Sequence, residues 1–323
     1  MLTVKNIMKK FNLEAGLFAR FGKFVHAVNG VSFEIRDGEC YGLVGESGCG
    51  KTTTARLLVE MYPLDSGQIV FQSRSGEVFD SGSMDRTKLR HLRAKVKYIF
   101  QDPAKSLNPR MNILEILTTG YEHSVNWPGK KQARLEAQAI MKDVGLSPDD
   151  LERRPSDFSG GQRQRISIAR ALIEKPELLI CDEVVSALDV SIQSQILTLL
   201  LDIRKEFNLS LLFIAHDLTV VSYFCDRIGV MYGGLIVEEA PAVELRTKRF
   251  HPYTKVLFSS IPQIDIQKTE KSDVIIDTQD TTAEVAGCPF FERCPDADPS
   301  CQKKKPVLRE VEMGHFVACH ISR

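Results

Sequence analysis

Short apolar runs alternate with helical patterns along the first 261 residues. Four runs are predicted to form buried strands, at residues 41–44, 96–100, 178–181 and 211–214. Between the second and third of these strands, residues 104–174 have a mostly helical pattern that Pro and Gly residues interrupt. Alternating strands and helices predict an α/β domain with a mainly parallel sheet, and residues 104–174 are predicted to form a helical subdomain within it.

The pattern changes after residue 261. Residues 262–287 are polar and acidic, with few periodic apolar positions, which is typical of a linker. Residues 288–323 contain four of the eight cysteines of the chain. We therefore expect a folded domain at residues 1–261, a linker at 262–287 and a small cysteine-rich lobe at 288–323.

The overall charge and the length of the apolar runs exclude several classes of protein. Lys and Arg number 42, and Asp and Glu also number 42, so no net charge attracts the chain to nucleic acid. Apolar runs such as residues 211–215 are far shorter than the roughly 20 residues of a membrane-spanning helix. Residues 1–10 lack the apolar stretch of a secretory signal, so the expected compartment is the cytoplasm, where cysteines stay reduced or bind metal.

The segment after the first predicted strand matches a phosphate-binding loop. Gly45-Glu46-Ser47-Gly48-Cys49-Gly50-Lys51-Thr52 fits the pattern G-x-x-x-x-G-K-[ST], and a helical run follows from Thr53. In such a loop the backbone N–H groups surround the β-phosphate, the lysine reaches the β- and γ-phosphates, and the threonine ligates Mg²⁺. The predicted ATP-binding residues are therefore Gly45, Ser47, Gly48, Cys49, Gly50, Lys51, Thr52 and Thr53. An accidental glycine-rich turn is the alternative, and the strand-to-helix context disfavours it.

The predicted strand at 178–181 is followed by two carboxylates. Asp182 suits the outer coordination of Mg²⁺, and Glu183 suits the polarisation of an attacking water. An isolated Asp-Glu pair would be interpreted as a solvated strand end. The phosphate loop earlier in the chain favours the catalytic interpretation.

The segment Ser159-Gly160-Gly161-Gln162 opens a predicted helix and has two interpretations. By itself, Ser-x-x-Gln is a helix capping box. It also matches the Ser-Gly-Gly-Gln signature of ABC ATPases, and it lies about twenty residues before the acidic strand, at that family's spacing. Gln101, the segment Ser186-Ala187-Leu188-Asp189 and the pair His216-Asp217 follow further strands in the same order, so the chain resembles ABC ATPases over nearly its whole length.

The resemblance implies a fold and a set of site residues. The implied fold is an ABC-type P-loop ATPase domain with a mainly parallel core sheet, an antiparallel β part and a helical subdomain, followed by the cysteine-rich lobe. In this family two such domains enclose two ATP molecules head to tail. The resemblance implies that Ser159, Gly160, Gly161 and Gln162 bind the γ-phosphate held by the opposite subunit, and that Asp189 lies at the subunit interface. It implies catalytic roles for Glu183, His216 and Gln101. It also implies Mg²⁺ binding by Thr52, Gln101 and Asp182. Phe11 is the first choice for stacking on adenine and Phe24 the second, although an insertion at 16–23 separates Phe11 from the next strand. An ordinary core aromatic is the alternative.

Four further stretches, at residues 42–51, 100–103, 106–111 and 251–254, most resemble the second ATPase of oligopeptide/dipeptide importers. That resemblance implies a second, related ATPase as partner, two transmembrane permease subunits, indirect contact with a solute-binding protein, and a peripheral place on the cytoplasmic face of the cell membrane. Nickel or another solute as cargo, or a non-transport ABC ATPase, are the alternatives. Val184 replaces the usual Pro after the catalytic Glu, which is expected to loosen the turn and leave activity intact.

Cys288, Cys294, Cys301 and Cys319 crowd into the last part of the chain. Four thiolates match the ligand number of an iron–sulfur cluster or a tetrahedral zinc ion. The peptide-importer resemblance implies a [4Fe–4S] cluster, while zinc, with His315 or His320 as substitute ligands, and the absence of a metal are the alternatives. Cys40, Cys181 and Cys225 are predicted to be small buried side chains.

Overall fold

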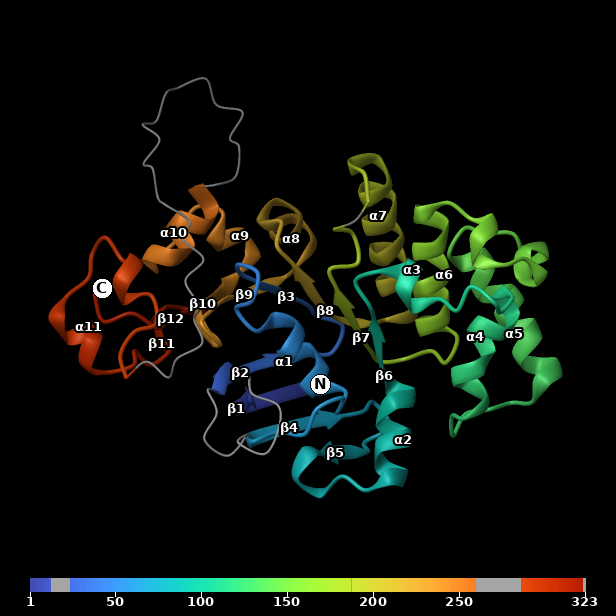
Figure 1. Cartoon of the computed structure of the whole chain (residues 1–323), viewed down its shortest axis with the longest axis horizontal. Helices are drawn as coiled ribbons and strands as arrows, with labels where there is room; N and C mark the ends of the chain where they lie inside the picture. Colours follow the sequence, from blue (N-terminus) through green and yellow to red (C-terminus); the bar gives the residue numbers. More distant parts are fainter. Residues whose placement is uncertain (13–23, 187, 260–285, 322–323) are drawn as a thin grey trace.

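The computed structural model describes residues 1–12, 24–186, 188–259 and 286–321. Two β-sheets occupy the middle of the molecule, with a group of helices at one end of its long axis and the C-terminal segment at the other (Figure 1). Most of the predicted linker at 262–287, and the insertion predicted at 16–23, lie outside the described residues. Within the described residues, no helix combines the length and the apolar character needed to cross a membrane.

The larger sheet contains all four strands predicted from the sequence, each within one residue of the predicted bounds. Its parallel part has the order β9-β3-β8-β7-β6. Its strands are β3 (Cys40–Val44), β6 (Val96–Ile99), β7 (Leu178–Asp182), β8 (Ser210–Ala215) and β9 (Arg227–Tyr232). Three antiparallel strands extend it beyond β9, in the order β10 (Leu235–Pro241), β12 (His315–Val317) and β11 (Arg309–Glu312).

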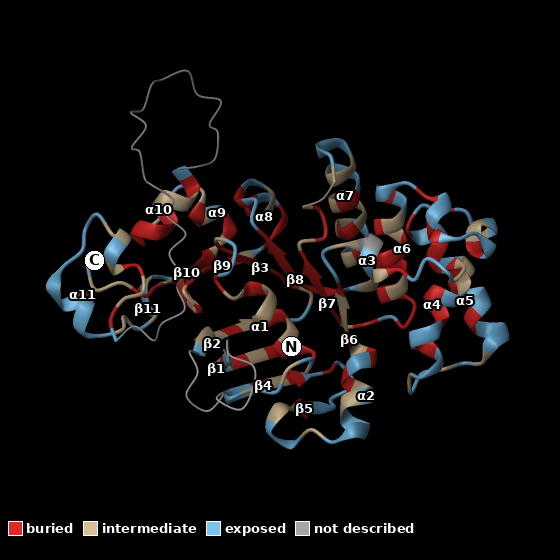
Figure 2. Cartoon of the chain, viewed as in Figure 1, coloured by how far each residue is buried: buried red, intermediate tan, exposed pale blue. Residues whose placement is uncertain are grey.

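The parallel strands β3, β7 and β8 are buried on both faces, as Figure 2 shows. In β7, Leu179 and Cys181 belong to the apolar cluster that includes the helices, whereas Leu178 and Ile180 belong to a second cluster with the smaller sheet. Successive side chains of a strand point to opposite faces, so one short apolar run contributes to both cores. This explains why the predicted strands are continuous apolar runs rather than alternating ones.

The smaller sheet is antiparallel and has the order β2-β1-β4-β5. Its strands are β1 (Leu2–Asn12), β2 (Phe24–Ile35), β4 (Ser66–Gln72) and β5 (Val78–Asp80). Helix α1 (Lys51–Leu58) contacts both β2 and β7, so it lies between the two sheets. Helix α2 (Arg86–Lys95) leads into β6.

A group of helices falls within residues 104–174, the segment predicted to be a helical subdomain. They are α3 (Pro103–Ser106), α4 (Ile113–Glu122), α5 (Lys130–Asp143), the 3₁₀ turns η3 (Pro148–Glu152) and η4 (Pro155–Asp157), and α6 (Gly160–Leu172). Helix α6 contacts α3, α4 and α5 as well as β6, so it joins this group to the sheet. Four helices follow before the C-terminal segment, namely α7 (Val190–Phe207), α8 (Leu218–Phe224), α9 (Ala242–Leu245) and α10 (Pro252–Ser259).

The C-terminal segment is joined to the larger sheet. It consists of η5 (Phe291–Arg293), α11 (Pro299–Lys303) and the strands β11 and β12. Strand β12 pairs with β10, and the fully buried His315 side chain of β12 lies 2.7 Å from a carboxylate oxygen of Glu238 in β10. Within the segment predicted to be a cysteine-rich lobe, residues 309–317 therefore extend the main sheet.

Candidate nucleotide-binding and hydrolysis site

The phosphate loop, residues 45–52, connects β3 to α1, and its backbone requires glycine at two positions. Gly45 has φ 153° and Gly50 has φ 108°. A Cβ atom at Gly45 would lie 2.2 Å from the carbonyl oxygen of Met231, and one at Gly50 would lie 2.1 Å from that of Ala27. Any side chain at either position would therefore displace a neighbouring strand.

The other residues of the loop divide between surface and interior. Ser47 and Gly48 are exposed at its tip, whereas Cys49 is buried. Lys51 is also buried, and its Nζ donates to the carbonyl oxygens of Gly45 at 2.8 Å and Glu46 at 2.9 Å. The ammonium group is thereby held inside the loop, where a phosphate-loop lysine meets phosphate oxygens. Thr52 and Thr53 follow in the first turn of α1, both half-buried.

Two of the three side chains predicted to bind Mg²⁺, Thr52 and Asp182, lie together. The Thr52 hydroxyl donates to Asp182 Oδ1 at 3.0 Å, and Asp182 is buried at the end of β7. The second oxygen, Oδ2, accepts a hydrogen bond from the Tyr98 hydroxyl at 2.5 Å. Burial, followed by the Asp182 charge, raises the pKa of Tyr98 well above its ordinary value, so the hydroxyl stays a donor. A hydroxyl and a carboxylate are the hard oxygen ligands that Mg²⁺ prefers, so these residues fit the ion.

The three predicted catalytic side chains also converge. Gln101 Nε2 donates to Glu183 Oε2 at 2.5 Å, and His216 Nδ1 lies 4.0 Å from Glu183 Oε1. Gln101 and His216 are exposed, and Glu183 is partly buried between them. A cavity of ≈ 40 Å³ has Glu183, Ser186 and His216 in its lining, which is room for a water molecule.

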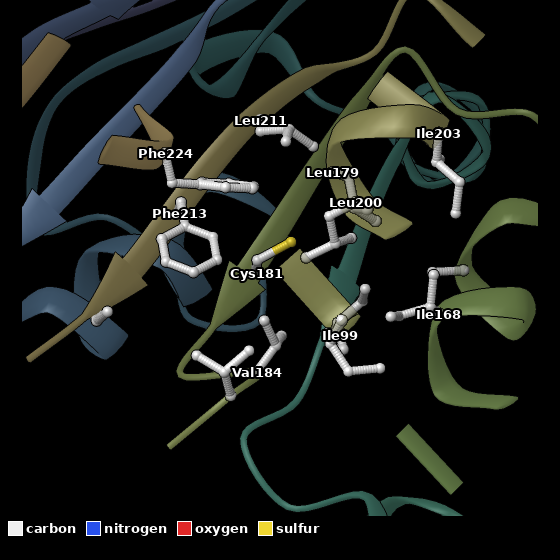
Figure 3. Close-up of a cluster of buried hydrophobic side chains, with 14 of the residues drawn as sticks. Ile99, Ile168, Leu179, Cys181, Val184, Leu200, Ile203, Leu211, Phe213 and Phe224 are labelled. Atoms are coloured by element: carbon white, nitrogen blue, oxygen red, sulfur yellow. The ribbon is translucent and has the colours of Figure 1, made fainter. Parts of the chain in front are cut away.

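Glu183 occupies an unusual backbone conformation. Its φ is 51°, in the left-handed region that non-glycine residues rarely adopt. The Glu183 N–H donates to the carbonyl oxygen of Ile214 at 2.9 Å, and the Ser186 hydroxyl donates to the Glu183 carbonyl at 2.9 Å. Val184 is buried in the apolar cluster beside Cys181 (Figure 3). Two hydrogen bonds and the burial of Val184 therefore hold a turn that has no proline at position 184.

The signature segment caps α6 and faces solvent. The Ser159 hydroxyl accepts the Gln162 N–H at 3.3 Å, and Gln162 Oε1 accepts the Ser159 N–H at 2.9 Å, so the capping box is present. Ser159, Gly160 and Gln162 are exposed. Gly161 is buried, and a Cβ there would lie 2.7 Å from Ile192 of α7. The capping interpretation is thus correct, and it leaves an exposed helix N-terminus.

Asp189 and Phe11 are the remaining predicted site residues. Asp189 is exposed, and its carboxylate caps α7 by accepting the Ile192 N–H at 3.4 Å. Ala187 of the same motif lies outside the described residues. The Phe11 ring is half-buried at the end of β1, edge-on to Tyr62 at 5.3 Å, while the other candidate, Phe24, is exposed.

All eight cysteines lie in the described part of the chain, and all have free thiols. Burial, as the largest cause, raises the pKa of the Cys288 thiol to about 11. Within the described residues, no three His, Cys, Asp or Glu side chains converge as a metal ion requires. His315 is engaged by Glu238, and His320 Nε2 lies 2.8 Å from the Lys304 carbonyl oxygen. Cys40, Cys181 and Cys225 are buried, as predicted.

Together the fold and the phosphate loop define a P-loop nucleoside triphosphatase. The oligopeptide transport ATP-binding protein AppF of Bacillus subtilis (strain 168) is 41% identical, and the match covers 99% of this chain and 97% of AppF. The putative oligopeptide transport ATP-binding protein YkfD of the same organism is 44% identical over 93% of this chain and 90% of YkfD. The chain belongs to the ABC transporter ATP-binding subunits of the oligopeptide/dipeptide family, and it is an ATPase.

Two family models match separate parts of the chain. Residues 28–186 match "ABC transporter", and residues 237–301 match "Oligopeptide/dipeptide transporter, C-terminal region". Among solved structures, the ATP-binding cassette MJ0796, a dimer bound to ADP and Pi, has a TM-score of 0.64 at 24% identity, covering 75% of this chain and 99% of that chain. The predicted fold class, an α/β ABC-type ATPase, is confirmed.

Proposed function

We propose that this chain binds and hydrolyses ATP to drive the import of peptides, as one of two related ATPases attached to two transmembrane permease subunits. In this proposal it lies on the cytoplasmic face of the membrane, and a solute-binding protein delivers the cargo to the permeases. The peptide assignment is supported by the match of residues 237–301 to the oligopeptide/dipeptide transporter region and by the peptide-transport names of the relatives.

The observation that supports the proposal is that the phosphate loop and the signature segment lead into different helices, α1 and α6, and that most of the signature segment is exposed. Thr52 and Asp182 lie beside the phosphate loop, whereas Ser159 opens a helix that faces solvent elsewhere. In the view of Figure 1, β6 and β7 lie between α1 and α6. An exposed helix N-terminus binds anions through its N–H groups and its dipole, so Ser159 to Gln162 are available to the γ-phosphate held by another subunit.

The chemistry proposed for the site is the attack of water on the γ-phosphorus. The Glu183 carboxylate orients the water and accepts its proton, while the bond from the γ-phosphorus to the bridging oxygen breaks and ADP leaves. Lys51 and the loop N–H groups stabilise the charge on the phosphates, and His216 donates to the γ-phosphate. Thr52, Asp182 and Gln101 would hold Mg²⁺, which when bound would neutralise negative charge on the phosphates.

Phe11 is proposed to stack on adenine. It pairs with Val25 in β2, and the same strand approaches the phosphate loop at Ala27, whose carbonyl oxygen borders Gly50. The end of β1 therefore lies beside the strand that contacts the loop, and the half-buried ring of Phe11 has an exposed part available for stacking.

A test of the cargo uses cells that lack this chain. We expect the deletion to abolish uptake of a labelled short peptide, and the unchanged gene to restore it, because transport needs ATP hydrolysis by this subunit. A matched gene carrying Glu183→Gln should fail to restore uptake. Unchanged peptide uptake together with lost uptake of labelled nickel would instead favour the metal cargo.

The four C-terminal cysteines are proposed to hold a [4Fe–4S] cluster. A single zinc ion needs all its sulfur ligands at about 2.3 Å. The described residues contain no group of side chains that converges in this way. The four cysteines match in number the thiolate ligands of a [4Fe–4S] cluster, and this count supports the proposal.

Replacement of a ligand tests the cluster. Cys301→Ser should remove most of the iron from anaerobically purified protein, which should otherwise contain about four irons per chain and absorb through thiolate-to-iron charge transfer. Cys225→Ser, a buried cysteine outside the segment, is the control and should keep its iron. Full iron content in Cys301→Ser, or zinc without iron in the unchanged chain, would rule out the proposed ligand set.

A further inference from the structure

The C-terminal segment contacts the phosphate loop directly. Arg293, in η5, donates from Nη1 and Nη2 to the two carboxylate oxygens of Glu46, each at 2.9 Å. Glu46 is the second residue of the phosphate loop and lies 247 residues earlier in the chain. Paired donors on both oxygens are the strong, orientation-specific form of an arginine–carboxylate contact.

The Arg293 side chain is itself held in place. It is 19% exposed, its Nη1 donates to the Tyr232 hydroxyl at 3.4 Å, and its guanidinium lies 5.6 Å from the ring centre of Phe290. Phe290 is buried and packs on Tyr232 and Tyr253. Hydrogen bonds to Glu46, as the largest cause, keep the pKa of Arg293 above its ordinary value.

Glu46 is held by three different parts of the chain. Its N–H donates to the Tyr253 hydroxyl at 2.9 Å, its carbonyl accepts from Lys51, and its carboxylate is bound by Arg293. Tyr253 belongs to the His251-Pro252-Tyr253-Thr254 stretch, and its own N–H donates to His251 Nδ1 at 3.1 Å. Burial lowers the pKa of His251 to about 4, so the ring is neutral at pH 7 and its Nδ1 can accept the hydrogen bond from Tyr253.

A second set of contacts joins the C-terminal segment to the phosphate loop. The turn between β9 and β10 lies against the loop, because the Gly234 N–H donates to the Cys49 carbonyl at 3.0 Å. On its other side, a Cβ at Gly233 would lie 3.0 Å from Pro289 of the C-terminal segment. Residues 289–293 therefore support the loop both through this turn and through Glu46.

We propose that Arg293 is a positioning residue for ATP binding, which neutralises and orients Glu46 so that the phosphate loop accepts a triphosphate. The inference rests on the proposed role of the phosphate loop. A carboxylate within the loop repels the negative phosphates, and the Arg293 guanidinium offsets that charge. The pair is partly screened by solvent, with Glu46 31% exposed, so the expected effect is moderate.

The test compares two ion pairs that both link the C-terminal segment to the rest of the chain. Arg293→Ala should raise the Kd and the KM for Mg-ATP about three- to tenfold and leave kcat within about twofold. Glu312→Ala is the matched control, because Glu312 pairs with Lys248 at 2.6 Å, away from the loop, and it should leave all three values unchanged. Arg293→Lys keeps the charge and loses the paired geometry, so it should give an intermediate KM.

Removing the charge of Glu46, the other partner of the ion pair, completes the test. Glu46→Gln combined with Arg293→Ala should return KM to within about twofold of the unchanged chain, because no unpaired carboxylate remains. Unchanged KM in Arg293→Ala or Arg293→Lys, an equal loss in Glu312→Ala, or no relief from Glu46→Gln would overturn the inference. If Arg293→Ala does not fold, the KM of Arg293→Lys alone tests the inference. Lys51→Ala should abolish ATP binding in every case, and its failure to do so would instead contradict the role of the loop.

Discussion

Glu183→Gln should stop ATP turnover while leaving ATP binding intact. The substitution removes the group proposed to accept the proton from water, and the loss of a positioned general base costs about 10²–10⁴-fold in rate. The phosphate loop, Thr52 and Asp182 do not depend on Glu183 for their contacts. Gln101 Nε2 would keep an amide oxygen as acceptor at position 183, so the local hydrogen bond is expected to survive.

The measurements for this variant are steady-state phosphate release and equilibrium binding of Mg-ATP. With hydrolysis blocked, the ATP-bound dimer should accumulate and be visible as a doubled mass in light scattering. Glu206→Gln, at an exposed position of α7, is the control and should hydrolyse ATP like the unchanged chain. Hydrolysis by Glu183→Gln within a fewfold of the unchanged rate would remove Glu183 from the catalytic role.

Ser159→Arg should block turnover without weakening the chain's own ATP binding. Its large cationic side chain would fill the helix N-terminus at which the γ-phosphate of another subunit is proposed to bind. We expect loss of about 10²-fold or more in hydrolysis by the assembled dimer, because removal of preorganised donors from a charged transition state has this magnitude. Nucleotide bound to the same chain's loop should be unaffected.

Two further variants separate this effect from loss of the helix cap. Ser159→Ala removes the hydroxyl that accepts the Gln162 N–H, which costs about 1 kcal/mol of stability and introduces no bulk. Ser156→Arg places the same bulky charge three residues earlier, at an exposed position of η4. Turnover should be near normal in Ser156→Arg. A Ser159→Arg chain that hydrolyses ATP at the unchanged rate would exclude a role for the signature segment.

Local patterns in the sequence were sufficient to predict the parts of the site that are continuous in the chain. The strand before Gly45, the loop itself and the cap at Ser159 each depend on neighbouring residues, and the structure has all three. The strand ending at Asp182 was predicted because both of its faces are buried, which gives an unbroken apolar run.

Contacts between distant segments could not be predicted in this way. Tyr98 reaches Asp182 only because β6 and β7 pair with Tyr98 opposite Ile180, and no local pattern fixes that register. Arg293 was missed because its partner Glu46 is 247 residues away. The short strands β11 and β12 have too few residues for an alternating pattern, so their addition to the main sheet also left no signal.

Hydrolysis is expected to need two chains, because the phosphate loop and the signature segment of one chain are proposed to serve different nucleotides. The most direct measurement is the rate of phosphate release per chain across a range of protein concentrations, with the mass of the same samples determined by light scattering. We expect the rate per chain to follow the fraction of dimer, whether between two copies or with the second ATPase added, and to vanish in monomeric samples. Full-rate hydrolysis by a sample that is demonstrably monomeric would contradict this account.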